Sequence, residues 1–189
     1  MGDWRPIGRL AEQVGAYCWV EHRLFALLGT WAAQPGAAGP LAAEATVFWA
    51  TASRRHARSA ESWRDRLPVR AGVEHGPLIV APPGPVAELL DGLAAELDPG
   101  RRLAGLSQVV LPRLGATYAE HLESASPVSE GAVMAALTAA SGRALGQIGP
   151  GRDLAQRLAV GHPGGAEFVQ ALERPFEGSV GLFPGVRPS

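Results

Sequence analysis

Four side chains of this sequence have the types and positions that acid–base or metal chemistry requires. Glu21 and His56 supply a carboxylate and an imidazole, and Tyr118 and His121 add a phenol and a second imidazole three residues apart. A carboxylate and an imidazole can pass protons as general base and acid, and the same groups bind divalent metals. Either chemistry requires a fold that brings the four side chains to one place.

The residues before His56 depart from a common metal-binding motif. Glu-x-x-His on a bundle helix sets a carboxylate and an imidazole one turn apart, both facing the bundle axis. Here the same register reads Ser53-Arg54-Arg55-His56, so the histidine is present and its carboxylate is not. A single inward histidine is also commonly a hydrogen-bonded core residue, and this alternative stays open.

Glu21 falls on the apolar stripe of a helix that we predict over residues 6–33. The stripe has spacings of three and four: Ile7, Leu10, Val14, Tyr17, Leu24, Leu28 and Trp31. A carboxylate on such a stripe is unfavourable unless it is paired, protonated or bound to a metal. In the alternative, the helix rolls so that Glu21 lies at its edge and pairs with Arg23 or with an arginine of a neighbouring helix.

A turn at residues 34–40 leads to a second predicted helix, residues 41–67, which ends before Pro68. Its inward stripe combines apolar residues with one histidine: Ala45, Trp49, Ala52, His56, Ser59 and Trp63. The arginines of this helix follow its outer face, where we expect them to be solvated. Two adjacent antiparallel helices of this kind would face Glu21 toward His56.

We predict an irregular connection over residues 69–85 and a short amphipathic helix over residues 86–97. Asp98-Pro99-Gly100 is typical of a helix start, and a third long helix should span residues 101–124, with Tyr118 and either His121 or Leu122 on its inward face. Pro112 should kink this helix and free a carbonyl toward the core or a ligand.

Ser126-Pro127-Val128-Ser129 is typical of a helix start, and a fourth helix should run from Ser129 or Glu130 to about Ile148. Its inward register is apolar and contributes no metal ligand. Short helices should follow at residues 153–160 and 165–173, before a tail from Arg174. The expected architecture is one all-α domain over residues 1–189, with its core at about 4–160 and a C-terminal helix and tail at 161–189.

Composition excludes several classes of function. The chain has 189 residues and a net charge of -1, and its 17 basic residues are scattered arginines, which argues against binding to nucleic acid. Cys18 is the only cysteine, so neither a disulfide framework nor a thiolate zinc site is expected. No apolar run reaches the length of a membrane span. We expect a cytoplasmic protein with a small-molecule substrate and no membrane partner; a homodimer stays open.

Three segments resemble the ferritin-like superfamily: VEHRLFALLG at residues 20–29, SRRHARSAESWRDRLP at 53–68 and LAGLSQVVLPRLGATYAEHLESASPVSEG at 103–131. The branch they are most similar to contains the tRNA-modifying di-iron hydroxylases. The resemblance implies an antiparallel four-helix bundle in which two metals are held by a Glu from each of two helices and a Glu-x-x-His from each of the other two.

By position, the resemblance matches Glu21 to the first-helix glutamate and His56 to the second-helix histidine. Ser53 stands where the second carboxylate belongs, and Glu120 or His121 could supply a ligand from the third helix. The fourth helix has replaced its ligands by small residues: Ala140, Ser141 and Ala144. The metal site that the resemblance implies is therefore degenerate.

Three readings follow from this degenerate di-iron site. We favour a biosynthetic enzyme that performs metal-independent acid–base chemistry in the bundle cavity, such as cyclisation, isomerisation or elimination in secondary metabolism. Glu21 would be the general base or acid, His56 or His121 its partner and Tyr118 a hydrogen-bond donor, without a cofactor. The alternatives are a mononuclear or di-iron hydroxylase with iron on Glu21, His56 and His121, and a non-catalytic binding or partner protein.

Overall fold

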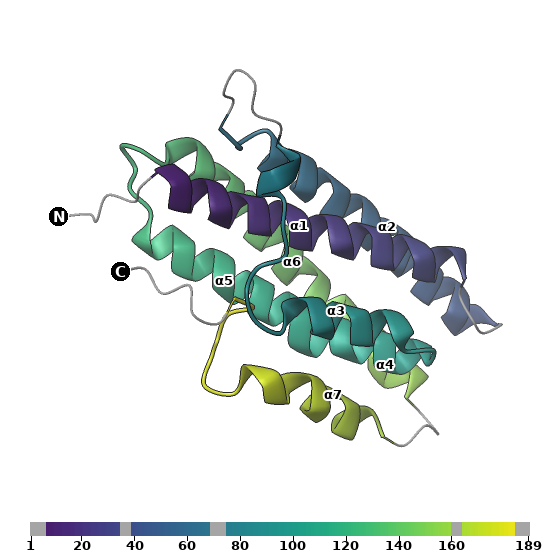
Figure 1. The fold of residues 1–189 in the computed structure, drawn as a ribbon. Coiled ribbons are helices and arrows are strands. Elements are labelled where there is room, and N and C mark those ends of the chain that lie inside the picture. The colour runs from purple at the N-terminus through teal and green to yellow at the C-terminus, as the bar shows by residue number, and fades with distance from the viewer. Residues whose placement is uncertain (1–6, 35–38, 69–74, 160–163, 184–189) are drawn as a thin grey trace.

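The computed structural model describes residues 7–34, 39–68, 75–159 and 164–183, and within these ranges the chain is all-α (Figure 1). The long helices are α1 (Ile7–Ala33), α2 (Pro40–Arg64), α5 (Leu111–Ser124) and α6 (Gly131–Leu158). The shorter elements are η1 (Gly76–Leu78), α3 (Val86–Ala95), α4 (Pro99–Ala104), η2 (Gly105–Val110), α7 (Gly165–Glu173) and η3 (Arg174–Phe176). The all-α prediction is thus confirmed for the described residues.

Side-chain contacts fix the directions of the long helices. In α1, Cys18 bonds Ala60 of α2, and further along α1, Phe25 bonds Ser53, which lies earlier in α2. These two helices are therefore antiparallel. Two further pairs are antiparallel by the same argument: α1 with α5, and α2 with α6. Consequently α2 and α5 run in the same direction, and the connection between them, which contains η1 and α3, returns along the length of the molecule (Figure 1).

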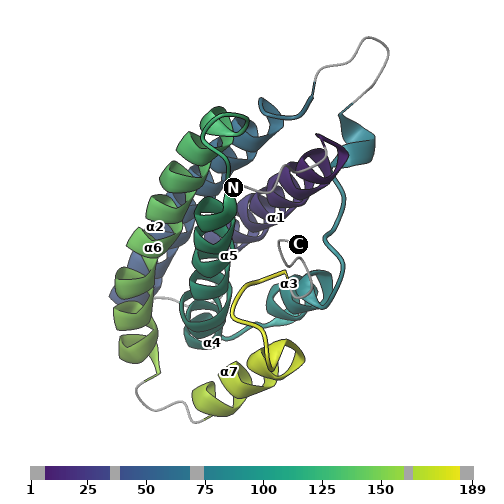
Figure 2. The same ribbon diagram turned by 90° about the vertical axis from the view of Figure 1, so that its left-hand side faces the viewer.

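The helices lie in three groups when the molecule is viewed from the side. Helices α2 and α6 form one flank, α1 and α5 lie in the middle, and α3 and α7 form the other flank (Figure 2). This arrangement buries the inward stripes predicted from the sequence. Tyr17, Leu24 and Leu28 of α1, and Trp49 and Trp63 of α2, are all at most 1% exposed.

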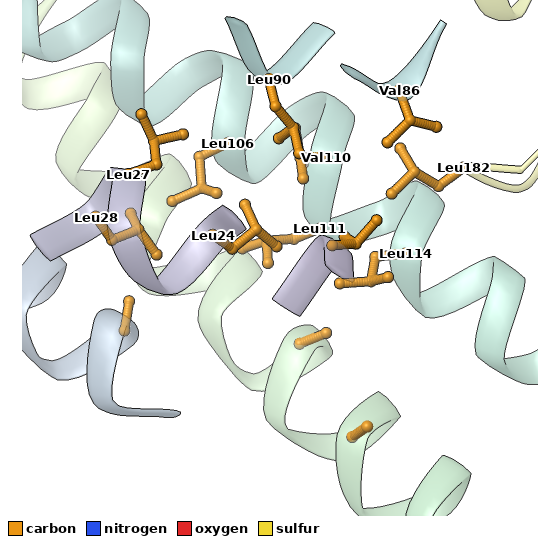
Figure 3. Packing of buried hydrophobic residues seen from close by; sticks show 14 of the residues in the cluster. Leu24, Leu27, Leu28, Val86, Leu90, Leu106, Val110, Leu111, Leu114 and Leu182 are labelled. Carbon is orange, nitrogen blue, oxygen red and sulfur yellow. The ribbon is translucent and has the colours of Figure 1, made fainter. Parts of the chain in front are cut away.

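The apolar core continues between α1, α3 and the η2–α5 region (Figure 3). Leu24 and Leu28 from α1 belong to the same buried cluster as Leu90 from α3 and Leu106 from η2. Burying side chains of this size stabilises a fold by roughly 1.5–3 kcal/mol each. This packing holds the third long helical segment against α1, which places Tyr118 opposite Glu21.

The third long helical segment is not one continuous α-helix. Asp98 caps α4 by accepting a hydrogen bond from the backbone N–H of Arg101 at 2.7 Å, so a helix starts where the sequence predicted one. Pro112 has no N–H to donate to the backbone carbonyl of Gln108. The turn before it widens into the π-helical η2, in which the N–H of Leu111 donates to the carbonyl of Leu106. The irregularity expected at Pro112 therefore takes the form of a π-helical segment.

Helix α6 corrects the prediction that the fourth helix ends near Ile148 and that a separate helix begins at Asp153. It continues through Pro150 to Leu158. At Gly151 the helix lies so close to its neighbours that an added Cβ would be 2.9 Å from the Cβ of Ser107 and 3.2 Å from Phe48. The packing of Gly151 against η2 and α2 stabilises the continued helix. This gain outweighs the loss of the one backbone hydrogen bond that Pro150 cannot make.

The remaining predictions about connections are described only in part. The turn at 34–40 and the connection at 69–85 each include residues outside the described ranges, as do the end of the helix predicted at 153–160 and the last residues of the tail. Helix α7 has the bounds expected for it, and α2 ends three residues before the predicted boundary. None of the described helices is long and apolar enough to cross a membrane.

Candidate functional site

Glu21, His56 and Tyr118 meet in the core through the two oxygens of one carboxylate. Oε2 of Glu21 lies 2.5 Å from Nδ1 of His56, and Oε1 accepts the hydroxyl hydrogen of Tyr118 at 2.6 Å. The three side chains come from α1, α2 and α5, and each is at most 2% exposed. The alternative in which the helix rolls and Glu21 pairs at its edge with an arginine is wrong, because Glu21 is buried and bonds His56 and Tyr118, while Arg23 pairs with Asp91 on α3.

Two aromatic rings pack against Tyr118, one member of this triad of Glu21, His56 and Tyr118. The ring of Trp63 lies 5.7 Å from that of Tyr118, and Tyr17 lies 4.9 Å from Trp63 and 5.1 Å from Tyr118. Because all three triad side chains are at most 2% exposed, their hydrogen bonds are strengthened, and the penalty for any member that loses its partner rises.

Burial raises the pKa of Tyr118 well above its ordinary value of 10.0, and the adjacent Glu21 carboxylate adds to this increase. The phenol therefore stays protonated and remains a hydrogen-bond donor to Glu21. On the other side of the carboxylate, Nδ1 of His56 is the donor. Nε2 of His56 is buried and has no hydrogen-bond partner among the described residues.

This raised pKa predicts how stability responds to alkaline pH. Because Tyr118 holds its proton in the fold and releases it near pH 10.0 when unfolded, its contribution is complete below that pH and is lost as the pH rises toward the folded pKa. We expect Tyr118→Phe to lower the free energy of unfolding by about 1–3 kcal/mol at pH 7, with a smaller difference from wild type above pH 10.

Urea unfolding followed by circular dichroism between pH 7 and pH 11 measures this difference. Tyr17→Phe is the matched control, because Tyr17 is equally buried but its hydroxyl bonds Gln13 and His121. A difference between wild type and Tyr118→Phe that stays constant over the whole range would contradict the assignment.

His121 belongs to a second buried network, which adjoins the triad. The hydroxyl of Tyr17 accepts from Gln13 at 2.8 Å and lies 3.0 Å from Nδ1 of His121, whose Nε2 lies 3.0 Å from Oε2 of Glu130. A hydroxyl that accepts from Gln13 can donate to Nδ1, which places the imidazole proton on Nε2, facing Glu130. The structure thus holds His121 between Tyr17 and Glu130, whereas the sequence favoured an acid–base pairing with Glu21.

Glu130 was expected only to open the fourth helix, and its buried carboxylate was missed from the sequence. It is the residue before α6, but its side chain makes no capping bond to that helix. It accepts instead from the backbone N–H of Ser126 at 3.3 Å and contacts His121 across the α5–α6 turn.

Two serines of α2 make hydrogen bonds to neighbouring helices. Ser53, at the position where the sequence resemblance implied a carboxylate, donates to the backbone carbonyl of Phe25 at 2.9 Å, and Ser59 accepts from Arg143 of α6 at 2.9 Å. Among the described residues, no group of three or more His, Cys, Asp or Glu side chains could hold a metal ion, so Glu21, His56 and His121 do not form such a group.

A cavity of about 870 Å³, the α1–α2 cavity, is lined by residues of α1, of α2 and of the segment 75–79. Its inner wall is made of small side chains, Cys18, Ala57 and Ala60, and the residues of the 75–79 segment form a further wall. Gly15 lets this segment approach α1, since a Cβ there would lie 1.8 Å from the carbonyl oxygen of Leu78.

The cavity also carries polar side chains that sequence reasoning treated as surface or ignored: His22, Glu61, Arg64 and His75. Burial raises the pKa of the Cys18 thiol, which donates to the carbonyl of Ala60 at 3.4 Å and is therefore a structural donor rather than a nucleophile. Ala57 follows His56 directly, and Cys18 lies one turn before Glu21. The wall of the cavity thus adjoins the triad, although none of the triad residues lines it.

Comparison of the chain with family models, curated proteins and solved structures found no match in any of the three.

Proposed function

We propose that this protein is a small-molecule-modifying enzyme with a ferritin-like bundle, which performs acid–base chemistry with Glu21 and His56 in place of metal chemistry. The observation that carries the proposal is the buried carboxylate–imidazole pair, in which Nδ1 of His56 is held by Glu21 while Nε2 has no described partner. Cyclisation, isomerisation and elimination require a proton donor and acceptor of this kind.

Chain topology supports the ferritin-like part of the proposal. Ferritin-like bundles differ from simple up-and-down bundles in having one long crossover connection. Here α2 and α5 run in the same direction, which requires such a crossover between the second and third long segments. Glu21 and His56 also lie near the middles of the first two helices, where the metals of that superfamily are held.

The geometry of the triad supports its role in proton transfer. A histidine whose Nδ1 is fixed by a carboxylate presents Nε2 in one orientation, and this is the arrangement that general-base histidines use in unrelated enzymes. Tyr118 holds the other oxygen of Glu21, so the carboxylate cannot turn away from His56. In the proposed reaction, Nε2 takes a proton from the substrate and returns it at another atom.

The cavity between α1 and α2 is the proposed substrate site. Its volume of about 870 Å³ lies within the roughly 300–1,000 Å³ range of small-molecule pockets. The small side chains of the inner wall would receive an apolar part of the substrate, and Arg64 and Glu61 would orient its polar groups. The substrate would approach His56 from the side of Cys18 and Ala60, which line the cavity and lie one turn from Glu21 and His56 along their helices.

Solvent deuterium incorporation tests the proposed chemistry even when the substrate is not identified. We expect wild-type protein, incubated in D₂O with a pooled extract of small metabolites, to convert at least one compound into a form that carries deuterium on carbon. Mass spectrometry detects the change. In Glu21→Gln and His56→Gln the rate should fall by about 10²–10⁴-fold, because the proton acceptor or the group that orients it is lost.

The matched control is Glu44→Gln, which neutralises a carboxylate of α2 that pairs with Arg157 at the surface, far from the triad. Its rate should equal that of wild type. Deuterium incorporation that is unchanged in Glu21→Gln would end the catalytic assignment, as would its absence with wild-type protein.

A second candidate function is non-catalytic binding of a small molecule in the same cavity. The observation that favours it is that Glu21 and His56 are 1% and 2% exposed and do not line the cavity. In this case Ala57→Trp would abolish ligand binding while Arg58→Trp, at an exposed neighbouring position, would not. Ligand binding without deuterium incorporation supports this second candidate against the first.

A further inference from the structure

Arg102 is a buried cation whose hydrogen-bonding capacity is only partly used. It is 7% exposed, its Nε donates to the backbone carbonyl of Glu96 at 2.6 Å, and its guanidinium lies over the ring of Trp31, 5.3 Å from the centroid. Nη1 is buried and has no hydrogen-bond partner among the described residues. A buried donor left unpaired costs about 1–3 kcal/mol, more when it is charged, so this atom requires an explanation.

The acidic groups nearest to Arg102 in the chain are engaged elsewhere. Oε1 of Glu96 accepts the backbone N–H groups of Leu97 and Asp98 at 2.8 Å, and Oδ1 of Asp98 caps α4. Burial lowers the pKa of Arg102, and the charges of Glu96 and Asp98 counteract this decrease. A guanidinium nevertheless stays protonated in proteins, so Arg102 is a cation at neutral pH.

Arg102 lines a cavity of about 310 Å³ between the C-terminal half of α1, α3 and the start of α4. Most of the other wall is apolar and includes Leu27 and Leu90, which Figure 3 labels. Thr30 and Gln34 add neutral polar groups, and the other arginine of the wall, Arg23, is paired with Asp91. The cavity therefore combines one available buried cation with an apolar interior, at the small end of the range of ligand pockets.

We infer that this second cavity binds a small organic carboxylate, with its carboxylate on Arg102 and its hydrocarbon part against Leu27 and Leu90. A planar guanidinium matches the two oxygens of a carboxylate, and such charge-assisted bonds are stronger than neutral ones. The apolar wall favours an aliphatic or aromatic acid over inorganic phosphate, which would leave this wall without a partner. The site is separate from the α1–α2 cavity and does not depend on the proposed function.

Binding of hexanoate tests this inference, with 1-hexanol as the neutral probe of the same chain length and inorganic phosphate as the anion without hydrocarbon. Isothermal titration calorimetry and ligand-observed NMR measure the affinities. We expect saturable binding of hexanoate that is about tenfold or more tighter than that of 1-hexanol or phosphate, because only hexanoate satisfies both the cation and the apolar wall.

Two variants assign this binding to the cavity. Arg102→Gln should weaken hexanoate binding about tenfold or more and leave 1-hexanol binding unchanged. Ala94→Trp obstructs the cavity from an exposed position of α3 and should weaken both ligands, whereas Ala95→Trp, on the same helix but outside the wall, should weaken neither. If Arg102→Gln does not fold, comparison of Ala94→Trp with Ala95→Trp still decides whether hexanoate binds in this cavity.

Hexanoate binding that equals 1-hexanol binding, or that survives Ala94→Trp, would overturn the inference. So would tighter binding of phosphate than of hexanoate, or an absence of saturable hexanoate binding to the wild-type protein.

Discussion

Glu21→Leu should lower the free energy of unfolding by about 2–6 kcal/mol, because it leaves two buried groups without their acceptor and each such loss costs about 1–3 kcal/mol. Leucine has nearly the volume of glutamate, so the change opens little cavity. It leaves Nδ1 of His56 and the hydroxyl of Tyr118 buried without their shared acceptor, since both bond the Glu21 carboxylate. Urea unfolding followed by circular dichroism measures the loss.

Two further variants separate the hydrogen bonds from the charge. In Glu21→Gln the amide oxygen can still accept from Tyr118 and the amide nitrogen can donate to Nδ1 of His56, so we expect a loss below about 1.5 kcal/mol. In the triple variant Glu21→Leu, His56→Leu, Tyr118→Phe, every polar member is removed together, and most of the stability should return. A loss within about 1 kcal/mol for Glu21→Leu alone would show that the triad is not desolvated as described.

The contact between Glu21 and His56 could be predicted because it depends on few variables. The two helices are adjacent in sequence and joined by a short turn, and both have regular apolar stripes that fix which face is buried. Once those faces are opposed in antiparallel order, a residue in the middle of α1 must meet one in the middle of α2. Local periodicity alone therefore brings the carboxylate to the imidazole.

The partners of His121 could not be predicted in the same way. Its position depends on how α5 is placed against α1, and this is set by the long connection through η1 and α3 and by the core around Leu106. A shift of one turn would have brought His121 to the level of Glu21, but Tyr118 lies there. Glu130 was missed because its sequence context is that of a helix start, and no local pattern shows that its side chain turns back into the core.

Helix α6 shows where local signals are overridden by packing. The sequence Gly149-Pro150-Gly151 is typical of a helix break, and the prediction followed it. The helix continues because Gly151 permits close contact with Ser107 and Phe48, which come from other elements. The cavity between α1 and α2 escaped prediction for a similar reason, since one of its walls is a distant segment that approaches α1 at a glycine.

Gly15→Ala should destabilise the protein by about 1–3 kcal/mol, the usual cost of forcing an extra carbon into a packed contact. In an exposed helix the same change would stabilise by about 1 kcal/mol, because alanine has the higher helix propensity. At Gly15 the new Cβ would lie 1.8 Å from the carbonyl oxygen of Leu78 and 2.8 Å from its carbonyl carbon. Neither is the end of a flexible side chain, so the 75–79 segment must move away from α1.

Gly142→Ala is the matched control, since Gly142 lies in the middle of α6, is exposed and has nothing within 4 Å of its added Cβ. It should raise the free energy of unfolding by up to about 1 kcal/mol. In Gly15→Ala, hydrogen exchange should also accelerate at the amides of Leu78 and Ile79, whose bonds to His75 and Gly76 hold the η1 turn. The amides of α6 should keep their protection.

The displacement has a consequence for the proposed substrate site, because His75, Gly76 and Ile79 form one wall of the α1–α2 cavity. Gly15→Ala should therefore weaken ligand binding there and slow the deuterium incorporation assigned to Glu21 and His56, while hexanoate binding near Arg102 stays unchanged. If Gly15→Ala is as stabilising as Gly142→Ala, the 75–79 segment does not rest on α1, and the cavity loses the wall that closes it.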